Sequence, residues 1–326
     1  MCSTQGNEGG GRGRLCIVVP CHNEEASLPP FCAATSKVEQ SLLGTYVEEV
    51  RYVFIDDGSS DATARVLRSM NEREPARYHY VSFSRNFGKE AALLAGLDKA
   101  LRLDADFVAV MDADLQDPPE LLVDMFRTMG TTECDAVAAY RRTRAGEPPI
   151  RSWFAHKFYR LINRISDVQM RDGARDFRLM RRYMVESIVA LPERTRFSKG
   201  LFQWVGYTTE WVGYDNVERE QGSTSWSFSS LVRYAMEGII SFSVVPLEAI
   251  SILGLVLFVL AILFLIFIIV RALIFGDPVA GWPSTVCLIT LFGSLQLLGI
   301  GILGLYLSRV FTETKGRPVY VVKEER

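Results

Sequence analysis

Cysteine and histidine are scarce in this sequence, and neither forms a recognisable ligand pattern. The chain of 326 residues holds six cysteines and three histidines. No two cysteines stand in a CxxC pair, and no Cys/His spacing typical of a zinc site occurs. These absences argue against a disulfide-stapled or zinc-stapled domain. They predict reduced thiols in a cytosolic domain.

Charge is missing from two long segments. No Asp, Glu, Lys or Arg occurs in residues 249–270 or in residues 279–308. Each segment exceeds the roughly 20 apolar residues that cross a bilayer as a helix. Buried core helices are the alternative, but they are usually shorter. We therefore expect a two-helix transmembrane hairpin within residues 242–310, with helices at about 247–271 and 283–308.

The two ends of the chain are polar. Residues 1–14 are rich in glycine and lack the apolar stretch of a secretory signal, so we expect a disordered tail there. Residues 311–326 are expected to form a cytoplasmic tail. Basic residues follow the second apolar segment, which favours the cytoplasm for both ends, although Arg271 in the short outer loop is a counter-signal. We expect an integral protein of the cytoplasmic membrane whose catalytic domain faces the cytoplasm.

The net charge of −2 hides a strongly basic stretch. Residues 141–182 contain twelve Lys or Arg against four Asp or Glu, a net charge of +8. Such a cluster suits substrate phosphates or lipid headgroups, with a solvated basic face as the alternative. Within it, residues 151–165 form an amphipathic pattern that predicts a helix either in the membrane interface or packed on the soluble domain. Residues 226–241 are expected to form a second interfacial helix.

Strand and helix patterns alternate through the first part of the chain. Apolar runs predict strands at 15–19, 50–55, 78–83, 107–111 and 136–140, with helices at 24–43, 62–72, 89–101 and 118–129 between them. This alternation predicts an α/β domain with a mostly parallel sheet covered on both faces. Ligands of such sheets lie outside the carboxyl ends of the strands.

Aspartates follow two of these expected strands. Asp112 and Asp114 can offer oxygen ligands to a divalent cation, and Gln116 can add a third. Asp56 or Asp57 can accept from a nucleoside, or can cap the next helix. A lone Asp-x-Asp is weak evidence, because Asp-rich turns are common.

Four motifs occur in order and carry a resemblance. VVPCHNEE, FIDDGSSDAT, SRNFGKE and MDADLQDPPE together resemble the family 2 inverting glycosyltransferases, which have a GT-A (Rossmann-like) fold. DFRLM, KGLFQWVGY and the double apolar segment are more similar to the polyprenyl-phosphate glycosyltransferases. That group includes bactoprenol glucosyltransferase and dolichol-phosphate mannose synthase. The resemblance covers residues 15–322, of which 15–225 would be the catalytic domain and 141–225 its acceptor region.

The resemblance also implies roles for individual residues. Asp176 matches the proposed catalytic base, Arg178 lies near the acceptor phosphate, and Asp114 joins them as a catalytic residue. Mg²⁺ or Mn²⁺ would be held by Asp112, Asp114 and Gln116. The donor pocket would be lined by Pro20, Asn23, Glu24, Asp56, Asp57, Arg85, Asn86, Lys89, Asp112 and Ala113. The acceptor phosphate would be met by Arg141, Arg142, Arg175 and Arg178.

Two of these roles have alternatives. Lys89 could be an ordinary helix-surface lysine. Asp176 could orient the acceptor rather than act as a base, because a phosphate monoester with a second pKa of about 6 is largely ionised near neutral pH. No likely covalent nucleophile is apparent, so we expect a single in-line displacement with inversion.

The expected reaction is transfer of a hexose to a polyprenyl phosphate such as undecaprenyl phosphate. UDP-glucose is the first choice of donor, and GDP-mannose is the second. A processive polysaccharide synthase is disfavoured because no QxxRW signature and no further spans are seen, and a non-catalytic membrane scaffold is the remaining alternative. We expect no nucleic-acid partner, while contacts between the spans would allow a homo-oligomer.

Overall fold

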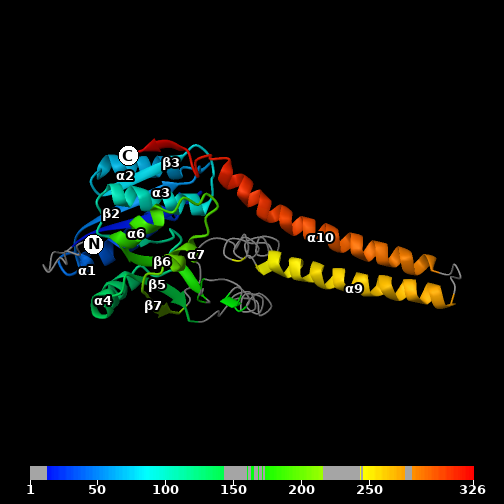
Figure 1. Cartoon of the computed structure of the whole chain (residues 1–326). Helices are drawn as coiled ribbons and strands as arrows, with labels where there is room; N and C mark the ends of the chain where they lie inside the picture. The colour runs from blue at the N-terminus through cyan, green and yellow to red at the C-terminus, as the bar shows by residue number, and fades with distance from the viewer. Residues whose placement is uncertain are drawn as a thin grey trace, which may run out of the picture.

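The protein consists of an α/β body from which a long helical hairpin projects (Figure 1). The computed structural model describes residues 13–142, 160, 163–164, 168, 171, 173–215, 243, 245–275 and 281–326. The predicted interfacial helix at 226–241 and most of the predicted helix at 151–165 lie outside these residues. Gly13 and Arg14, which were expected in the N-terminal tail, already belong to the first strand.

The body is built around one mixed sheet. In the described residues its strand order is β7-β5-β6-β4-β1-β2-β3-β8. The strands are β1 (Gly13–Cys21), β2 (Val47–Asp56), β3 (Tyr78–Phe83), β4 (Phe107–Val110), β5 (Ala136–Arg141), β6 (Ala174–Arg181), β7 (Thr209–Tyr214) and β8 (Val322–Glu325). The central strands β4, β1, β2 and β3 are parallel, whereas β6 runs antiparallel to both β4 and β5. The predicted α/β fold class of GT-A type is confirmed.

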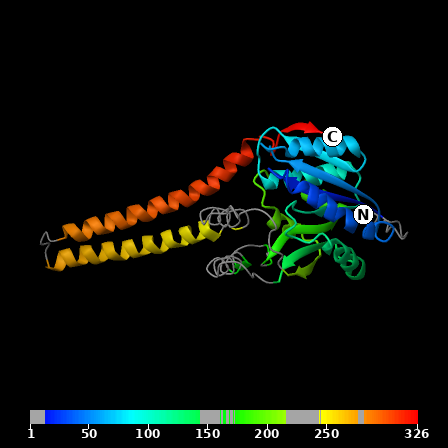
Figure 2. The same ribbon diagram turned by 180° about the vertical axis from the view of Figure 1, so that it is seen from behind.

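Helices cover both faces of this sheet (Figure 2). They are α1 (Leu28–Leu42), α2 (Thr63–Arg73), α3 (Lys89–Arg102), α4 (Leu121–Thr132), α6 (Arg182–Val189) and α7 (Ser198–Trp204). One buried cluster includes Phe31 and Met125, and a second includes Val18 and Met184. Because both faces are packed, β1 is an almost continuous apolar run, as the sequence pattern indicates.

Two helices begin later than expected. Helix α1 starts at Leu28 because residues 24–27 form a turn, in which the Ser27 N–H donates to the Glu24 carbonyl at 3.1 Å. Helix α4 starts at Leu121 after a similar turn, closed by its own N–H on the Pro118 carbonyl. In both places the residues just before the helix therefore belong to the loop that follows the preceding strand.

Gly96 brings α3 unusually close to the sheet. A Cβ at this position would lie 2.2 Å from the Val18 side chain of β1. The close approach depends on the missing side chain and sets the height of α3 above the strands. It therefore fixes where the first residue of α3, Lys89, stands relative to the strand ends.

The C-terminal residues belong to the sheet. Residues 311–326, the expected cytoplasmic tail, include β8, which pairs antiparallel with β3. Glu324 forms an ion pair with Arg68 at 2.6 Å, and the ring of Tyr320 stacks on Phe83 with centroids 4.9 Å apart. An open sheet edge offers unpaired N–H and C=O groups, and the returning chain satisfies those of β3.

The hairpin consists of α9 (Val245–Phe275) and α10 (Trp282–Thr314). The segments Val245–Phe264 and Leu291–Thr314 are long and apolar enough to cross a membrane, and none of either window is buried inside the protein. A soluble core helix would be covered by protein, so this exposure favours membrane spans over core helices. Both helices are longer than the predicted 247–271 and 283–308. The Tyr306 hydroxyl donates to the Ser243 carbonyl at 2.7 Å, near the start of α9.

Candidate active site

The loops after β1 and β2 are tied to each other. Asn23, whose φ of +56° is unusual for a residue other than glycine, accepts the N–H of Ser60 on its side-chain oxygen at 2.8 Å. Its own N–H donates to the Ser59 hydroxyl at 2.9 Å. The Glu24 N–H donates to the Thr63 hydroxyl at 2.8 Å. Asn23 and Glu24, both predicted donor-pocket residues, therefore lie where these two loops meet. Pro20 pairs with Ile55 just before this point.

Asp56 and Asp57 are buried, with exposed fractions of 1% and 4%. The Asp56 carboxylate accepts the Ser82 hydroxyl at 2.7 Å and the Ser59 N–H at 3.0 Å. The Asp57 carboxylate accepts the N–H groups of Phe87 and Gly88 at 2.6 and 2.9 Å. Both carboxylates thus hold the protein's own loops together.

The turn between β2 and α2 packs against the loop after β3. A Cβ on Gly58, which has a φ of +64°, would lie 2.3 Å from the backbone of Arg85. The His22 ring lies 2.9 Å from the Asp57 carbonyl and 3.2 Å from the Asn86 amide nitrogen. Arg85 and Asn86 are exposed in this loop. The structure therefore adds His22, which sequence reasoning missed although it lies inside the PCHNEE motif.

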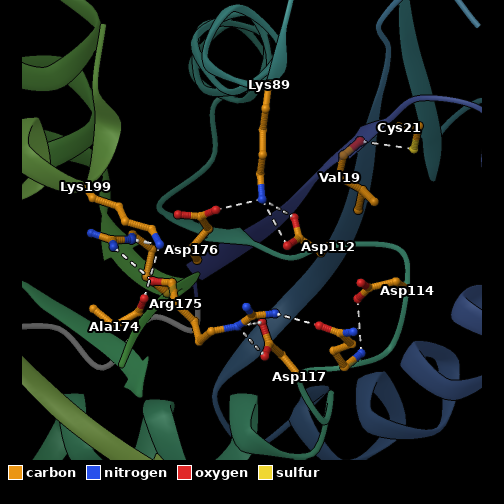
Figure 3. A network of polar contacts seen from close by, with 12 residues as sticks. Val19, Cys21, Lys89, Asp112, Asp114, Asp117, Ala174, Arg175, Asp176 and Lys199 are labelled. Atoms are coloured by element: carbon orange, nitrogen blue, oxygen red, sulfur yellow. Dashed lines mark hydrogen bonds and ion pairs between the residues drawn. The ribbon is translucent and has the colours of Figure 1, made fainter. Parts of the chain in front are cut away.

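Lys89 bridges two carboxylates that are far apart in the sequence. Its Nζ lies 2.7 Å from Asp112 Oδ1 and 2.6 Å from Asp176 Oδ2 (Figure 3). The three side chains come from the start of α3, the end of β4 and the start of β6. The side chains of Lys89, Asp112 and Asp176 are 43%, 25% and 16% exposed, so the bridge is partly exposed. Lys89 is thus partnered with both carboxylates, and Ala113 beside them is buried.

The two bridged carboxylates differ in pKa. Burial raises the pKa of Asp112 above its usual value, although Lys89 opposes this. Burial also acts to raise the pKa of Asp176, but the ammonium groups of Lys89 and Lys199 outweigh it and hold that pKa well below the usual range. Asp176 is therefore an ionised group and a weak proton acceptor in this arrangement.

The loop after β4 presents the other candidate metal ligands. The Asp114 carboxylate accepts the N–H of Gln116 at 3.1 Å, across Leu115, whose φ is +55°. The Gln116 side-chain oxygen accepts from Arg141 at 3.0 Å and from Arg175 at 3.3 Å. No cluster of three or more His, Cys, Asp or Glu side chains suited to a metal occurs within the described part of the chain. Asp112 and Asp114 still supply the hard oxygens that Mg²⁺ takes when substrate phosphates complete its coordination.

A buried aspartate anchors the arginines beside this loop. Asp117 is 5% exposed and accepts from Arg175 Nε at 2.9 Å. It also accepts from the Tyr214 hydroxyl, which in turn lies 3.4 Å from Arg141 Nε. Asp117 was missed as a functional residue, although the LQDPP stretch contains it. Asp117 thus holds Arg175 directly, and Arg141 through Tyr214. Both arginines lie against Gln116 in the loop that carries the candidate metal ligands.

Arg142 and Arg178 are placed differently from Arg175. The side chain of Arg142 is exposed, and its backbone N–H donates to Tyr214. Arg178 is 2% exposed and lies over the Phe202 ring at 3.6 Å. Its guanidinium donates to the carbonyls of Arg175 and Asp176, and burial lowers its pKa to about 10. Arg178, expected near the acceptor phosphate, therefore lies within the core, where it supports the backbone of β6.

The sequence comparisons agree on one class of protein, the glycosyltransferases. The family model described as glycosyl transferase family 2 matches residues 16–189. The bactoprenol glucosyl transferase of Shigella phage SfV is 39% identical over 313 residues, covering 96% of this chain and 99% of its own length. An uncharacterized glycosyltransferase of Synechocystis is 40% identical over 313 residues, covering 95% of each chain.

Likeness among solved structures is weaker. Glucosyl-3-phosphoglycerate synthase from Mycobacterium tuberculosis has a TM-score of 0.43 at 17% identity, covering 70% of this chain and 78% of its own. Family membership therefore depends on the sequence matches, which run along most of the chain. This protein belongs to glycosyl transferase family 2.

Proposed function

We propose that this protein transfers glucose from UDP-glucose to a polyprenyl phosphate such as undecaprenyl phosphate, with inversion, at the cytoplasmic face of the membrane. The relatives named bactoprenol glucosyl transferase, which match over nearly the whole chain, support the reaction class and the acceptor. The observation that carries the proposal is the position of Lys89, which pairs with both Asp112 and Asp176. This bridge lies beside Arg175 and its partner Asp117. It joins a candidate donor-phosphate region to a candidate acceptor-phosphate region.

The donor side of the site is assigned to the ends of β1, β2 and β4. The nucleoside lies along Pro20, Asn23 and Glu24, with Asp56 and Asp57 holding the pocket walls. Arg85, Asn86 and Lys89 stand where the β3 end meets this pocket. Asp112 and Asp114 would hold Mg²⁺ or Mn²⁺ on the diphosphate, and the Gln116 oxygen would join them only by giving up its bonds to Arg141 and Arg175. The cation, when bound, stabilises the negative charge that develops on the departing diphosphate.

The acceptor side must bring a second anion close to the first. Arg141, Arg142 and Arg175 supply positive charge, and Asp117 fixes the direction of the Arg175 guanidinium. The acceptor phosphate is already largely ionised near neutral pH, so its oxygen needs little proton removal. Because Lys89 and Lys199 hold the pKa of Asp176 low, we assign Asp176 to orienting the acceptor and the cationic groups rather than to general-base catalysis.

The displacement is a single step. The acceptor phosphate oxygen attacks the anomeric carbon opposite the nucleoside diphosphate, so that the carbon–oxygen bond to the donor breaks as the new one forms. An α-linked donor would give a β-linked lipid phosphate sugar. The apolar hairpin α9–α10 would keep the protein at the membrane where its acceptor resides.

The direct test uses the purified full chain in detergent or liposomes with polyprenyl phosphate. Labelled UDP-glucose, UDP-galactose, UDP-GlcNAc and GDP-mannose are offered separately with Mg²⁺ or Mn²⁺. We expect label in the lipid fraction with UDP-glucose, and a β-configured product. Preferential transfer from GDP-mannose would replace the donor assignment. Absence of lipid product with every donor would refute the proposed function.

A further inference from the structure

The end of the second apolar helix is joined to the catalytic body by one glutamate. Glu313 is the penultimate residue of α10, and its carboxylate accepts the N–H of Arg194 at 3.0 Å and that of Thr195 at 2.9 Å. Arg194 Nε donates in return to the Arg317 carbonyl at 2.8 Å. Charge-assisted bonds from two successive N–H groups to one carboxylate fix both its position and its direction. They dock α10 on the segment of residues 190–197, the α6–α7 loop.

The α6–α7 loop is held at its other end as well. Arg196 is buried and donates to the carbonyls of Ile188 and Leu191, at the end of α6 and just after it. Its guanidinium therefore satisfies carbonyls that the end of α6 leaves without an intrahelical partner. The loop that carries Arg194 and Thr195 is thus braced against the end of α6 and leads directly into α7.

Helix α7 in turn supports the candidate active site. Ser198, its first residue, donates its N–H to the Glu90 carboxylate at 2.8 Å, and its hydroxyl donates to the same group. Lys199 Nζ donates to the Ala174 carbonyl at 3.3 Å and points toward Asp176 (Figure 3). Glu90 directly follows Lys89, the lysine that bridges Asp112 and Asp176. The start of α7 therefore contacts both β6, through Ala174, and α3, through Glu90.

We propose that Glu313 is a positioning residue, through which the docked end of α10 holds α7, and thus Lys199 and Asp176, in the arrangement that transfer requires. The inference rests on the proposed function for its chemical readout. In the described residues the hydrogen bonds of the Glu313 carboxylate go to Arg194 and Thr195, while the loops after β1 and β2 are tied to each other. Loss of Glu313 should therefore disturb the acceptor side and leave the nucleoside pocket at the ends of β1 and β2 intact.

The test compares two glutamates that both tie the C-terminal segment to the body. Glu313→Gln is isosteric and replaces the carboxylate by a neutral amide, whose single oxygen accepts the two N–H groups more weakly. Glu324→Gln is the matched control, because Glu324 binds Arg68 and Tyr80 at the far sheet edge. For Glu313→Gln we expect kcat for lipid transfer to fall about tenfold, with the KM for UDP-glucose changed less than about twofold. Glu324→Gln should retain the wild-type kcat.

Hydrogen exchange provides a second readout that needs no turnover. Amides of residues 198–204 should exchange faster in Glu313→Gln and at the wild-type rate in Glu324→Gln. A merely stabilising role would lower the melting temperature of Glu313→Gln but leave its kcat per folded molecule unchanged, and that result would overturn the inference. Wild-type kcat together with wild-type exchange in α7 would overturn the inference. A wild-type protein without lipid transfer would refute the proposed function, and the exchange comparison would still decide the role of Glu313.

Discussion

Two pairs of aspartates stand at the same edge of the sheet, and the protein holds them in opposite ways. Asp56 and Asp57 follow β2 and are almost completely buried, with carboxylates bonded to hydroxyl and N–H groups of neighbouring loops. Asp112 and Asp114 follow β4 and are only partly buried. Asp112 pairs with the partly exposed side chain of Lys89, and Asp114 accepts the N–H of Gln116 within its own loop.

This difference in burial and in bonding partners distinguishes carboxylates that can bind a ligand from carboxylates that hold the fold together. A buried carboxylate that accepts main-chain N–H groups cannot leave them without loss, because the donors would stay buried and unpaired. A carboxylate paired with a long lysine can exchange partners when a more strongly charged ligand arrives. This contrast supports the proposed roles of the β4 pair at the cation and donor diphosphate, and of the β2 pair in the walls of the pocket.

The largest effect is expected from Asp114→Ala. Without this oxygen ligand, charge on the leaving diphosphate is poorly stabilised, and lipid transfer should fall about 10³-fold. Initial rates at saturating donor measure this, and chelation of divalent cations should silence the wild type until Mn²⁺ or Mg²⁺ is restored. Asp124→Ala, at an exposed position of α4 paired with Arg127, is the control and should stay active. Full activity of Asp114→Ala would refute the proposed role of Asp112 and Asp114 in binding the cation.

Lys89→Met should have a somewhat smaller effect. The variant keeps the length of the side chain but leaves Asp112 and Asp176 facing each other without the cation between them. We expect kcat to fall about 10²-fold, because the developing charge loses one preorganised partner. Steady-state kinetics beside Lys37→Met, an exposed lysine of α1, provide the comparison. Equal kcat in the two variants would show that Lys89 is an ordinary helix-surface lysine without a role in transfer.

The smallest change in rate and the clearest change in stability are expected from Asp57→Asn. The amide brings an NH₂ group against the N–H groups of Phe87 and Gly88, so the free energy of unfolding should fall by about 2 kcal/mol. Denaturant unfolding of the variant is compared with that of Asp112→Asn, which should lose activity with little loss of stability. Unchanged stability of Asp57→Asn, combined with a weakened affinity for UDP, would reverse the distinction between the two pairs.

Much of the fold follows from local sequence patterns. The strands at 78–83 and 136–140 were predicted nearly to the residue, and the two apolar segments correspond to α9 and α10. The strands β6, β7 and β8 were not predicted as strands. They carry charged and polar residues in place of a clean apolar run, and only pairing with β4, β5 and β3 makes them strands.

The candidate site was only partly predictable. Asp112, Asp114 and Asp176 could be named from motifs, since each motif is continuous in the chain, and Arg175 could be named because it directly precedes one of them. Asp117 was overlooked, because nothing in its neighbours indicates burial beneath Arg175. Lys89 could be named but not given its partners, which lie 23 and 87 positions away in the sequence.

The sequence by itself determined the alternation of strands and helices, the two apolar spans and the position of acidic pairs after strands. These depend on hydropathy and periodicity over a few residues, which the chain carries locally. Only the tertiary structure decided which aspartates are locked into loops, which one meets Lys89, and that Glu313 of α10 reaches the loop before α7. Such contacts depend on the order of strands in the sheet and the approach of helices to it, and a linear pattern does not contain either.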